Sequence, residues 1–236
     1  MDKATRIGII GAMEPEISHL RENLTEKRVD VIAGMEFVSG RLGTREVIVV
    51  VCGVGKVNAA LCANVLSLRY NVSHVINTGV AGSLDARINI GDIVVSTDAV
   101  EHDFDVVALG YDAGEIPGMG VVAFEADSAL REAMVAAVRE VAPEVSVFEG
   151  RVASGDQFVS TREQKERIES EFAGLCCEME GAAIAHACHL ANVPFVIVRA
   201  ISDKADGSSH VDYRTFVREA ANRSARIVEA FVRTFD

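Results

Sequence analysis

Acidic side chains follow apolar runs at three places in this sequence, and each place could supply a carboxylate for acid–base chemistry. Glu16 follows RIGIIGA, Glu180 follows a short apolar segment, and Asp203 follows PFVIVRA. In open α/β sheets ligands bind beyond the carboxyl ends of the strands, so side chains at three strand ends can meet around one ligand. Two such carboxylates can act as general acid and general base.

Each of these acids also has a purely structural explanation. Glu14 and Glu16 lie beside Pro15, which suits a first helical turn, and acids there favour the helix dipole. Glu178 and Glu180 precede an Ala-rich stretch, where capping of a helix explains them equally well. No single place decides between the two explanations. The occurrence of three such places in one chain favours a site for acid–base chemistry.

The glycine-rich segments do not match the common nucleotide-binding motifs. GIIGAM lacks the GxGxxG spacing and the acidic residue that binds ribose, which argues against a dinucleotide site. GVGKVN at 53–58 departs from a P-loop at Val50 and Val57. NTGVAGSL at 77–84 follows an apolar run, and its glycines could bring backbone amides close to a ligand. Taken alone, that segment is better explained as a tight turn.

The histidines and cysteines do not indicate a metal site. His186 and His189 flank Cys188 on an expected helix, but no carboxylate stands at a suitable offset. His102, in VEHDFD, fits either a site residue or a solvated strand end. The five cysteines form no CxxC pair and lie mostly in apolar surroundings, which favours reduced thiols and a cytoplasmic location.

Composition narrows the possible partners. The 236 residues are 49% hydrophobic and 25% charged, as in ordinary globular proteins, and the net charge is −12. A surface this acidic repels phosphate backbones and anionic lipids, so nucleic acid and membranes are disfavoured as partners. The first residues do not resemble a signal peptide, and no run of 18 apolar residues occurs.

Short apolar runs alternate with helical patterns along the whole chain. Strands are expected at 6–12, 29–40, 45–53, 73–79, 91–103, 145–155 and 194–200. Helices are expected at 14–24, 56–68, 127–141, 161–172 and 180–191, with an irregular loop at 104–124. A closing helix is expected from the near-3.6 spacing of Phe216, Ala220, Ile227 and Phe231. Strands that are apolar on both faces and separated by helices indicate a largely parallel sheet covered on both sides. We therefore expect one α/β/α domain over residues 1–236.

Taken together, several segments resemble the 5′-methylthioadenosine/S-adenosylhomocysteine nucleosidases of the nucleoside phosphorylase/hydrolase superfamily. These segments are GIIGAMEPEI, CGVGKVNAA, NTGVAGSL, GDIVVS, HDFDV, SGDQFV, CEMEGAAIAH and VRAISD. The resemblance covers nearly the whole chain in order. It implies an α/β/α domain with a mixed, barrel-like central sheet, a homodimer, and hydrolysis of an N-glycosidic bond that releases adenine, without a cofactor or a metal.

The same resemblance implies roles for individual residues. Glu16 matches the base that activates water, Asp203 the acid that protonates adenine at N7, and Glu180 the group that grips the ribose hydroxyls. Further residues match the substrate-binding positions: Gly82, Phe158, Val159, Met179, Arg199, Ser202, Met13, Val54 and Tyr213, with Leu109, Tyr111 and Pro117 of the partner subunit. Arg199 would help to place the water, Phe158 would stack on adenine, and the Val159 backbone would recognise the adenine edge.

The chemistry makes demands that these assignments meet. Adenine leaves poorly until it is protonated, and a free Asp, with a pKa of about 3.9, is ionised near neutral pH. Burial at the end of an apolar strand is expected to keep Asp203 protonated. Two departures from the family pattern are Val80, where some members carry a serine that holds the water, and Leu109, where some carry an aromatic ring.

Three rival functions remain open. A purine nucleoside phosphorylase on the same fold would need cationic or hydroxyl donors for phosphate, whereas AMEPE after the first strand is acidic. A hydrolase of 6-amino-6-deoxyfutalosine, another adenine nucleoside, is not distinguished by these residues. A nucleoside-binding protein without activity is disfavoured, because binding alone has little need of Glu16 and Asp203.

Overall fold

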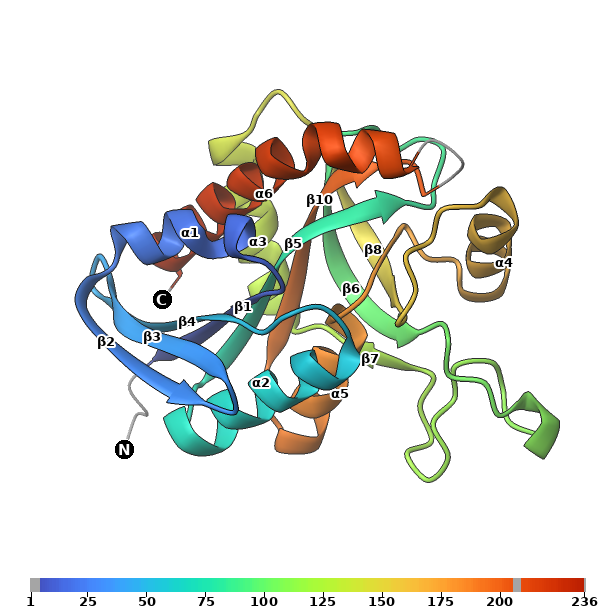
Figure 1. Ribbon diagram of the computed structural model, residues 1–236, viewed down its shortest axis with the longest axis horizontal. Coiled ribbons are helices and arrows are strands. Elements are labelled where there is room, and N and C mark those ends of the chain that lie inside the picture. The colour runs from blue at the N-terminus through green and yellow to red at the C-terminus, as the bar shows by residue number, and fades with distance from the viewer. Residues whose placement is uncertain (1–4, 206–208, 236) are drawn as a thin grey trace.

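The computed structural model describes residues 5–205 and 209–235 (Figure 1). The strands are β1 Arg6–Gly11, β2 Thr25–Ile32, β3 Met35–Leu42, β4 Arg45–Val51, β5 His74–Ser83, β6 Ile93–Glu101, β7 Ala123–Glu125, β8 Val147–Ser154, β9 Cys176–Glu178 and β10 Phe195–Asp203. The helices are α1 Glu14–Asn23, α2 Lys56–Tyr70, α3 Ser128–Val141, α4 Arg162–Phe172, α5 Gly181–Ala191 and α6 Ser209–Thr234, with a short 3-10 turn at Val107–Leu109.

The central sheet is mixed and partly closed. Strands β5, β10, β6, β8 and β9 pair in a ring, because β5 bonds to both β10 and β9. From β5 the sheet continues through β1, β4, β3 and β2. Within the ring, β5–β10 and β6–β8 are parallel, whereas β6–β10 and β5–β9 are antiparallel. The mixed, barrel-like sheet is therefore confirmed, and the expectation of a largely parallel sheet is wrong.

Most predicted elements are present, and three differ. The expected strand at 29–40 is two strands, because the chain turns at Ala33 and Gly34, both with positive φ, and β2 runs back along β3. The expected strand at 73–79 continues to Ser83. A short strand, β7, lies at the end of the predicted loop at 104–124 and pairs with β6. Glycines in NTGVAGSL therefore belong to a strand and not to a tight turn.

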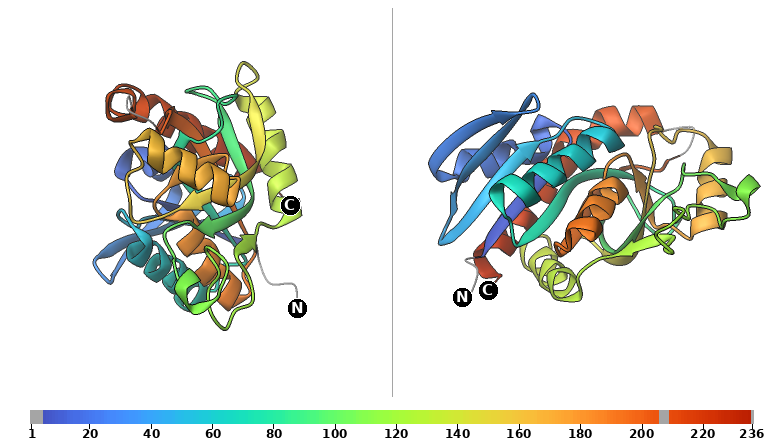
Figure 2. Two further views of the ribbon diagram at one scale, coloured as in Figure 1. Left: turned by 90° about the vertical axis from the view of Figure 1, so that its right-hand side faces the viewer. Right: turned by 90° about the horizontal axis from the view of Figure 1, so that it is seen from below.

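Helices cover both faces of the sheet. In Figure 1, α1, α3 and α6 lie on one face and α2 and α5 on the other, and Figure 2 shows α2 beside α5. The apolar residues of each face form a separate core, one beneath α1, α3 and α6 and one beneath α2 and α5. The described residues contain no helix long and apolar enough to cross a membrane.

Strand register brings the candidate residues together. Parallel pairing of β5 with β10 sets Gly82 opposite Asp203 and Gly79 opposite Arg199. Parallel pairing of β8 with β9 sets Ser154 opposite Glu178. The carboxyl ends of the parallel strands β5 and β10 meet at one edge of the sheet. The pairing of β9 with β5 and with β8 brings Glu178 to the same region.

Candidate active site

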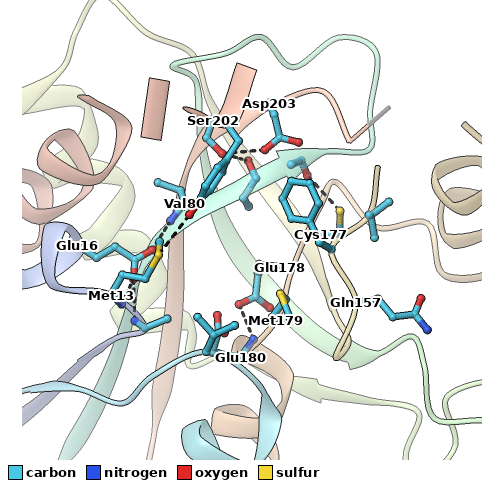
Figure 3. Close-up of a pocket in the computed structure, with 17 residues that line it drawn as sticks. Met13, Glu16, Val80, Gln157, Cys177, Glu178, Met179, Glu180, Ser202 and Asp203 are labelled. Carbon is cyan, nitrogen blue, oxygen red and sulfur yellow. Dashed lines mark hydrogen bonds between the residues drawn. The ribbon is translucent and has the colours of Figure 1, made fainter. Parts of the chain in front are cut away.

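A cavity of about 190 Å³ opens at these strand ends (Figure 3). Twelve residues singled out in the sequence line it: Met13, Glu16, Val54, Val80, Gly82, Phe158, Val159, Met179, Glu180, Ser202, Asp203 and Tyr213. Five further residues complete the lining: Ala12, Ala81, Gln157, Cys177 and Glu178. Among the residues that the structure describes, the lining contains four carboxylates and no lysine or arginine.

Glu16 is held by backbone amides from two elements. Its Oε2 accepts hydrogen bonds from the N–H groups of Ala12 (2.7 Å) and Met13 (2.9 Å), and its Oε1 accepts one from Val80 (3.1 Å). The side chain is 2% exposed, unlike the exposed Glu14 two residues earlier. Burial raises the pKa of Glu16, against the lowering effects of Arg199 and the three amides. Helix capping alone therefore does not explain this residue.

Asp203 ends β10 and lines the same cavity as Glu16, apart from it on the wall (Figure 3). Its side chain is 2% exposed. Ser202 Oγ donates to Asp203 Oδ1 at 2.9 Å, and the Ala205 N–H donates to Oδ2 at 3.0 Å. A bulge between Ile201 and Asp203 interrupts the register with β5 and brings the carboxyl group towards Gly82. The structure thus fixes this carboxyl group at the cavity wall.

Glu178, Glu180 and Arg199 form a buried cluster of ionisable groups near Glu16. Glu180 Oε1 accepts the Gly55 N–H at 2.8 Å, and burial, with the nearby charge of Glu178, raises the pKa of Glu180 to about 8. Arg199 is fully buried and donates to Glu178 and to Asn77. Arg199 does not line the cavity and lies behind its wall.

The rest of the cavity wall is apolar. Phe158 and Tyr213 meet edge to face, with ring centroids 5.8 Å apart, and the Tyr213 hydroxyl donates to Met13 Sδ at 3.3 Å. Val54 and Phe158 are largely exposed and form the rim. Such a wall, with a few polar groups at its base, suits a ligand that is aromatic at one end and apolar at the other.

Leu109, Tyr111 and Pro117 do not line the cavity of their own chain. All three are exposed on the segment between β6 and β7, which projects from the body of the molecule (Figure 1). This position leaves them available to a second copy of the chain.

The three histidines considered in the sequence lie against other side chains of the protein. His186 Nδ1 bonds to Glu101 at 3.0 Å, and its ring stacks on Phe124, which His189 also contacts. Within residues 5–205 and 209–235, no group of three His, Cys, Asp or Glu side chains has the geometry of a metal site. His102 is buried, so the alternative of a solvated strand end is wrong.

Sequence reasoning missed Glu178 as a cavity residue. It is one of two acids before an Ala-rich helix, and helix capping explains it in the sequence as well as any role in a site. The signal that could have found it is its place two residues before Glu180, at the end of a short apolar run. Gln157, Cys177, Ala12 and Ala81 carry no comparable signal, because only the folded backbone turns them inward.

Comparison with known proteins agrees with this geometry. A family model described as the phosphorylase superfamily matches residues 6–233. A 5′-methylthioadenosine/S-adenosylhomocysteine nucleosidase from Shewanella denitrificans is 41% identical over 228 residues, which is 96% of this chain and 98% of the relative. This chain belongs to the 5′-methylthioadenosine/S-adenosylhomocysteine nucleosidase family. A member from Staphylococcus aureus is 40% identical over 227 residues, 96% of this chain and 98% of that member.

Solved structures of the nucleosidase family have the same fold. The enzyme from Neisseria meningitidis in complex with methylthio-immucillin-A has a TM-score of 0.94 and 36% identity, and the match covers 98% of this chain and 100% of that one. The enzyme from Colwellia psychrerythraea in complex with adenine has a TM-score of 0.93 and 36% identity, with 98% and 95% covered. The mixed, barrel-like sheet is thus the fold of the family.

Proposed function

We propose that this protein hydrolyses the N-glycosidic bond of 5′-methylthioadenosine and S-adenosylhomocysteine, releasing adenine and the 5′-thioribose. 5′-Deoxyadenosine is a further candidate substrate. The observation that carries the proposal is the pair of buried carboxyl groups, Glu16 and Asp203, that line one cavity together with apolar side chains. Family members bound to methylthio-immucillin-A and to adenine support it.

Glu16 is proposed as the base that activates the attacking water. The water oxygen bonds to the anomeric carbon of ribose while its proton moves to Glu16 and the carbon–nitrogen bond to adenine breaks. The ribosyl group becomes cationic on the way, and the carboxylates around the cavity stabilise that charge. The raised pKa of Glu16 makes it a stronger base than an exposed carboxylate, provided that it is ionised before the reaction.

Asp203 is proposed as the acid that protonates adenine at N7. Burial of its carboxyl group favours the neutral form, which this role requires. The Ser202 hydroxyl and the Ala205 amide hold the carboxyl group in place. The Helicobacter pylori member with one aspartate changed to asparagine was solved with 5′-methylthioadenosine in its active site, which supports an aspartate of this kind in catalysis.

The remaining lining residues are proposed to bind the two ends of the nucleoside. Glu180, beside Met179, accepts hydrogen bonds from the ribose hydroxyls. Phe158 stacks on the adenine ring, and the backbone of Val159 hydrogen-bonds to the edge of adenine. Gly82 lines the cavity and offers a backbone contact. A Cβ atom there would lie 2.8 Å from Asp203 Oδ2, so a larger residue would crowd that carboxyl group. Met13, Val54 and Tyr213 form an apolar pocket for the methylthio or homocysteine group.

A homodimer is proposed to complete that pocket. Leu109, Tyr111 and Pro117 of the partner subunit would close its open side. Exposed apolar side chains on α2 and α5, such as Val57 (71% exposed) and Leu190 (66% exposed), support an interface on that face. Sedimentation velocity of the wild type and of Leu190→Asp tests the dimer. A monomeric wild type with full activity would contradict it.

We also propose a cytoplasmic location and a role in methionine salvage. All five cysteines are buried free thiols, which suits a reducing compartment. Methylthioribose, one product of the reaction, is a substrate that a salvage route could consume.

Two alternative activities remain to be tested. The futalosine hydrolase of Helicobacter pylori, solved as a mutant, has a TM-score of 0.92 and 33% identity, so 6-amino-6-deoxyfutalosine is a second candidate substrate. A phosphorylase is less well supported, because the described residues that line the cavity include no basic side chain and Arg199 is paired with Glu178. A carboxylate-lined cavity repels phosphate.

A chromatographic product assay with 5′-methylthioadenosine, with and without phosphate, tests these proposals. Adenine and free methylthioribose, unchanged by phosphate, are expected. A sugar 1-phosphate that forms only with phosphate would show a phosphorylase and overturn the role of Glu16. No adenine under either condition would exclude this substrate, and 6-amino-6-deoxyfutalosine would then be assayed in its place.

A further inference from the structure

Glu178 lines the cavity, and its carboxylate also accepts several hydrogen bonds from inside the protein. Its carboxylate accepts the N–H groups of Glu180 (3.0 Å) and Gly181 (2.8 Å to one oxygen, 2.9 Å to the other). It also accepts the Ser154 hydroxyl and one Arg199 nitrogen, Nη2. The side chain is only 3% exposed. Five donor contacts from three elements thus converge on one buried carboxylate.

Arg199 lies between Glu178 and Glu16 but pairs with only one of them. A Cβ atom at Gly79 would lie 2.2 Å from Arg199 Nη1 and 2.5 Å from Glu16 Oε1, so both groups border the same small space. In the part of the chain that the structure describes, the ion pair of Arg199 is with Glu178, and the Glu16 oxygens take backbone amides instead. The charge of Arg199 therefore reaches Glu16 through space and without a direct bond.

We propose that Glu178 is a positioning residue for the hydrolysis: it draws the Arg199 guanidinium away from Glu16 and holds the backbone that carries Glu180. This inference rests on the proposed function of the site. If Arg199 paired with Glu16 directly, the carboxylate would lose lone pairs and basicity that it needs to take a proton from water. Glu178 prevents that pairing because its charge-assisted hydrogen bond to Nη2 fixes the guanidinium in an orientation in which Nη1, the nitrogen nearer to Glu16, makes no hydrogen bond to that carboxylate.

The charges around Glu16 agree with the proposed role of Glu178. Among the described residues, the titratable groups that interact with Glu16 are Arg199 from β10, Glu180 at the start of α5, Tyr213 from α6 and Cys52 after β4. Arg199 is the only cation among them, and it lowers the pKa of Glu16. Glu178 offsets that cation and also raises the pKa of Glu180. Removing the charge of Glu178 should therefore lower the pKa of both acids.

Glu178→Gln tests the proposal, with Glu132→Gln on the exposed face of α3 as a matched control. We expect the acidic limb of kcat/KM against pH to move to lower pH. Removal of one unit charge at a separation on the order of 10 Å corresponds to roughly one pH unit at an effective dielectric constant of about 20. At pH 7 we expect kcat to fall by about tenfold, because the base is weaker and less well oriented. The control should change neither quantity.

Two further variants separate positioning from helix capping. Ser154→Ala removes one hydrogen bond to Glu178 and keeps every charge, so the limb should stay in place. Asn77→Asp adds a negative charge at the second acceptor of Arg199 Nη2 and should move the limb to higher pH. A limb that is unmoved in both Glu178→Gln and Asn77→Asp would overturn the proposal and leave Glu178 as a cap of α5. If Glu178→Gln does not fold, Asn77→Asp alone decides between these outcomes.

A measurement without substrate distinguishes failure of this inference from failure of the proposed function. Carbon NMR of glutamate-labelled protein follows the titration of Glu16, identified by the signal missing in Glu16→Gln. A lower apparent pKa for this signal in Glu178→Gln supports the inference, even if 5′-methylthioadenosine is not the substrate. An unchanged pKa of Glu16 in Glu178→Gln refutes the inference. If the wild type hydrolyses 5′-methylthioadenosine in the same study, the proposed function stands and only the inference fails.

Discussion

Replacing Gly79 by alanine should disable the site while leaving the fold intact. Gly79 lies on β5 immediately before Val80, whose N–H holds Glu16. The added Cβ atom would come within 2.2 Å of Arg199 Nη1 and 2.5 Å of Glu16 Oε1, whereas ordinary contacts begin at 3.4 Å. One or both groups must therefore move by about 1 Å. Arg199 is anchored by Glu178 and Asn77, so the Glu16 carboxylate is the group that we expect to move.

The size of the effect follows from that displacement. A misplacement of about 1 Å in a catalytic group costs on the order of 100-fold in rate, or about 2.7 kcal/mol of activation free energy. Overpacking a buried site also lowers the free energy of unfolding, by about 1–3 kcal/mol. We therefore expect kcat to fall about 100-fold, with KM much less affected because Gly79 does not line the cavity.

Continuous measurement of adenine release from 5′-methylthioadenosine, at saturating and at low substrate, gives both constants. Gly34→Ala is the control. It also adds a methyl group at a positive φ (+79°), but in open space at the turn between β2 and β3. It should lose about 1 kcal/mol of stability and no activity. A folded Gly79→Ala protein with the kcat of the wild type would refute the placement of Glu16 and Arg199 described above.

Three further predictions concern the acids. Asp203→Asn should bind a substrate analogue, measured by calorimetry, with little change but release adenine about 10²–10⁴-fold more slowly; full activity would exclude Asp203 as the acid. Glu16→Gln should lose activity to a similar extent, and a normal rate would mean that another group activates the water. Glu180 has its pKa raised from 4.5 to about 8, so the folded state keeps a proton that the unfolded state releases. The free energy of unfolding should therefore fall as pH rises from about 4.5 to 8, by up to about 1.4 kcal/mol per pH unit, and urea titrations of Glu180→Gln should show a flatter dependence over that range.

The sequence by itself determined the elements and their chemistry. Apolar runs predicted the strands β1, β4, β6, β8 and β10 to within a few residues, because such runs reflect the burial of short extended segments. The positions of Glu16, Glu180 and Asp203 after such runs indicated a site at strand ends. The turn at Ala33 and Gly34 was missed because apolar residues continue on both sides of it.

Only the tertiary structure decided how the sheet closes and which polar groups meet. The antiparallel pairing of β10 with β6 and the bond of β9 to β5 depend on contacts between distant segments, which no local pattern encodes. The same contacts decided that Glu178 pairs with Arg199 inside the protein instead of serving as an exposed cap. A residue type states what chemistry a side chain can do, but its partners depend on strand register and burial, and these arise from packing of the whole chain.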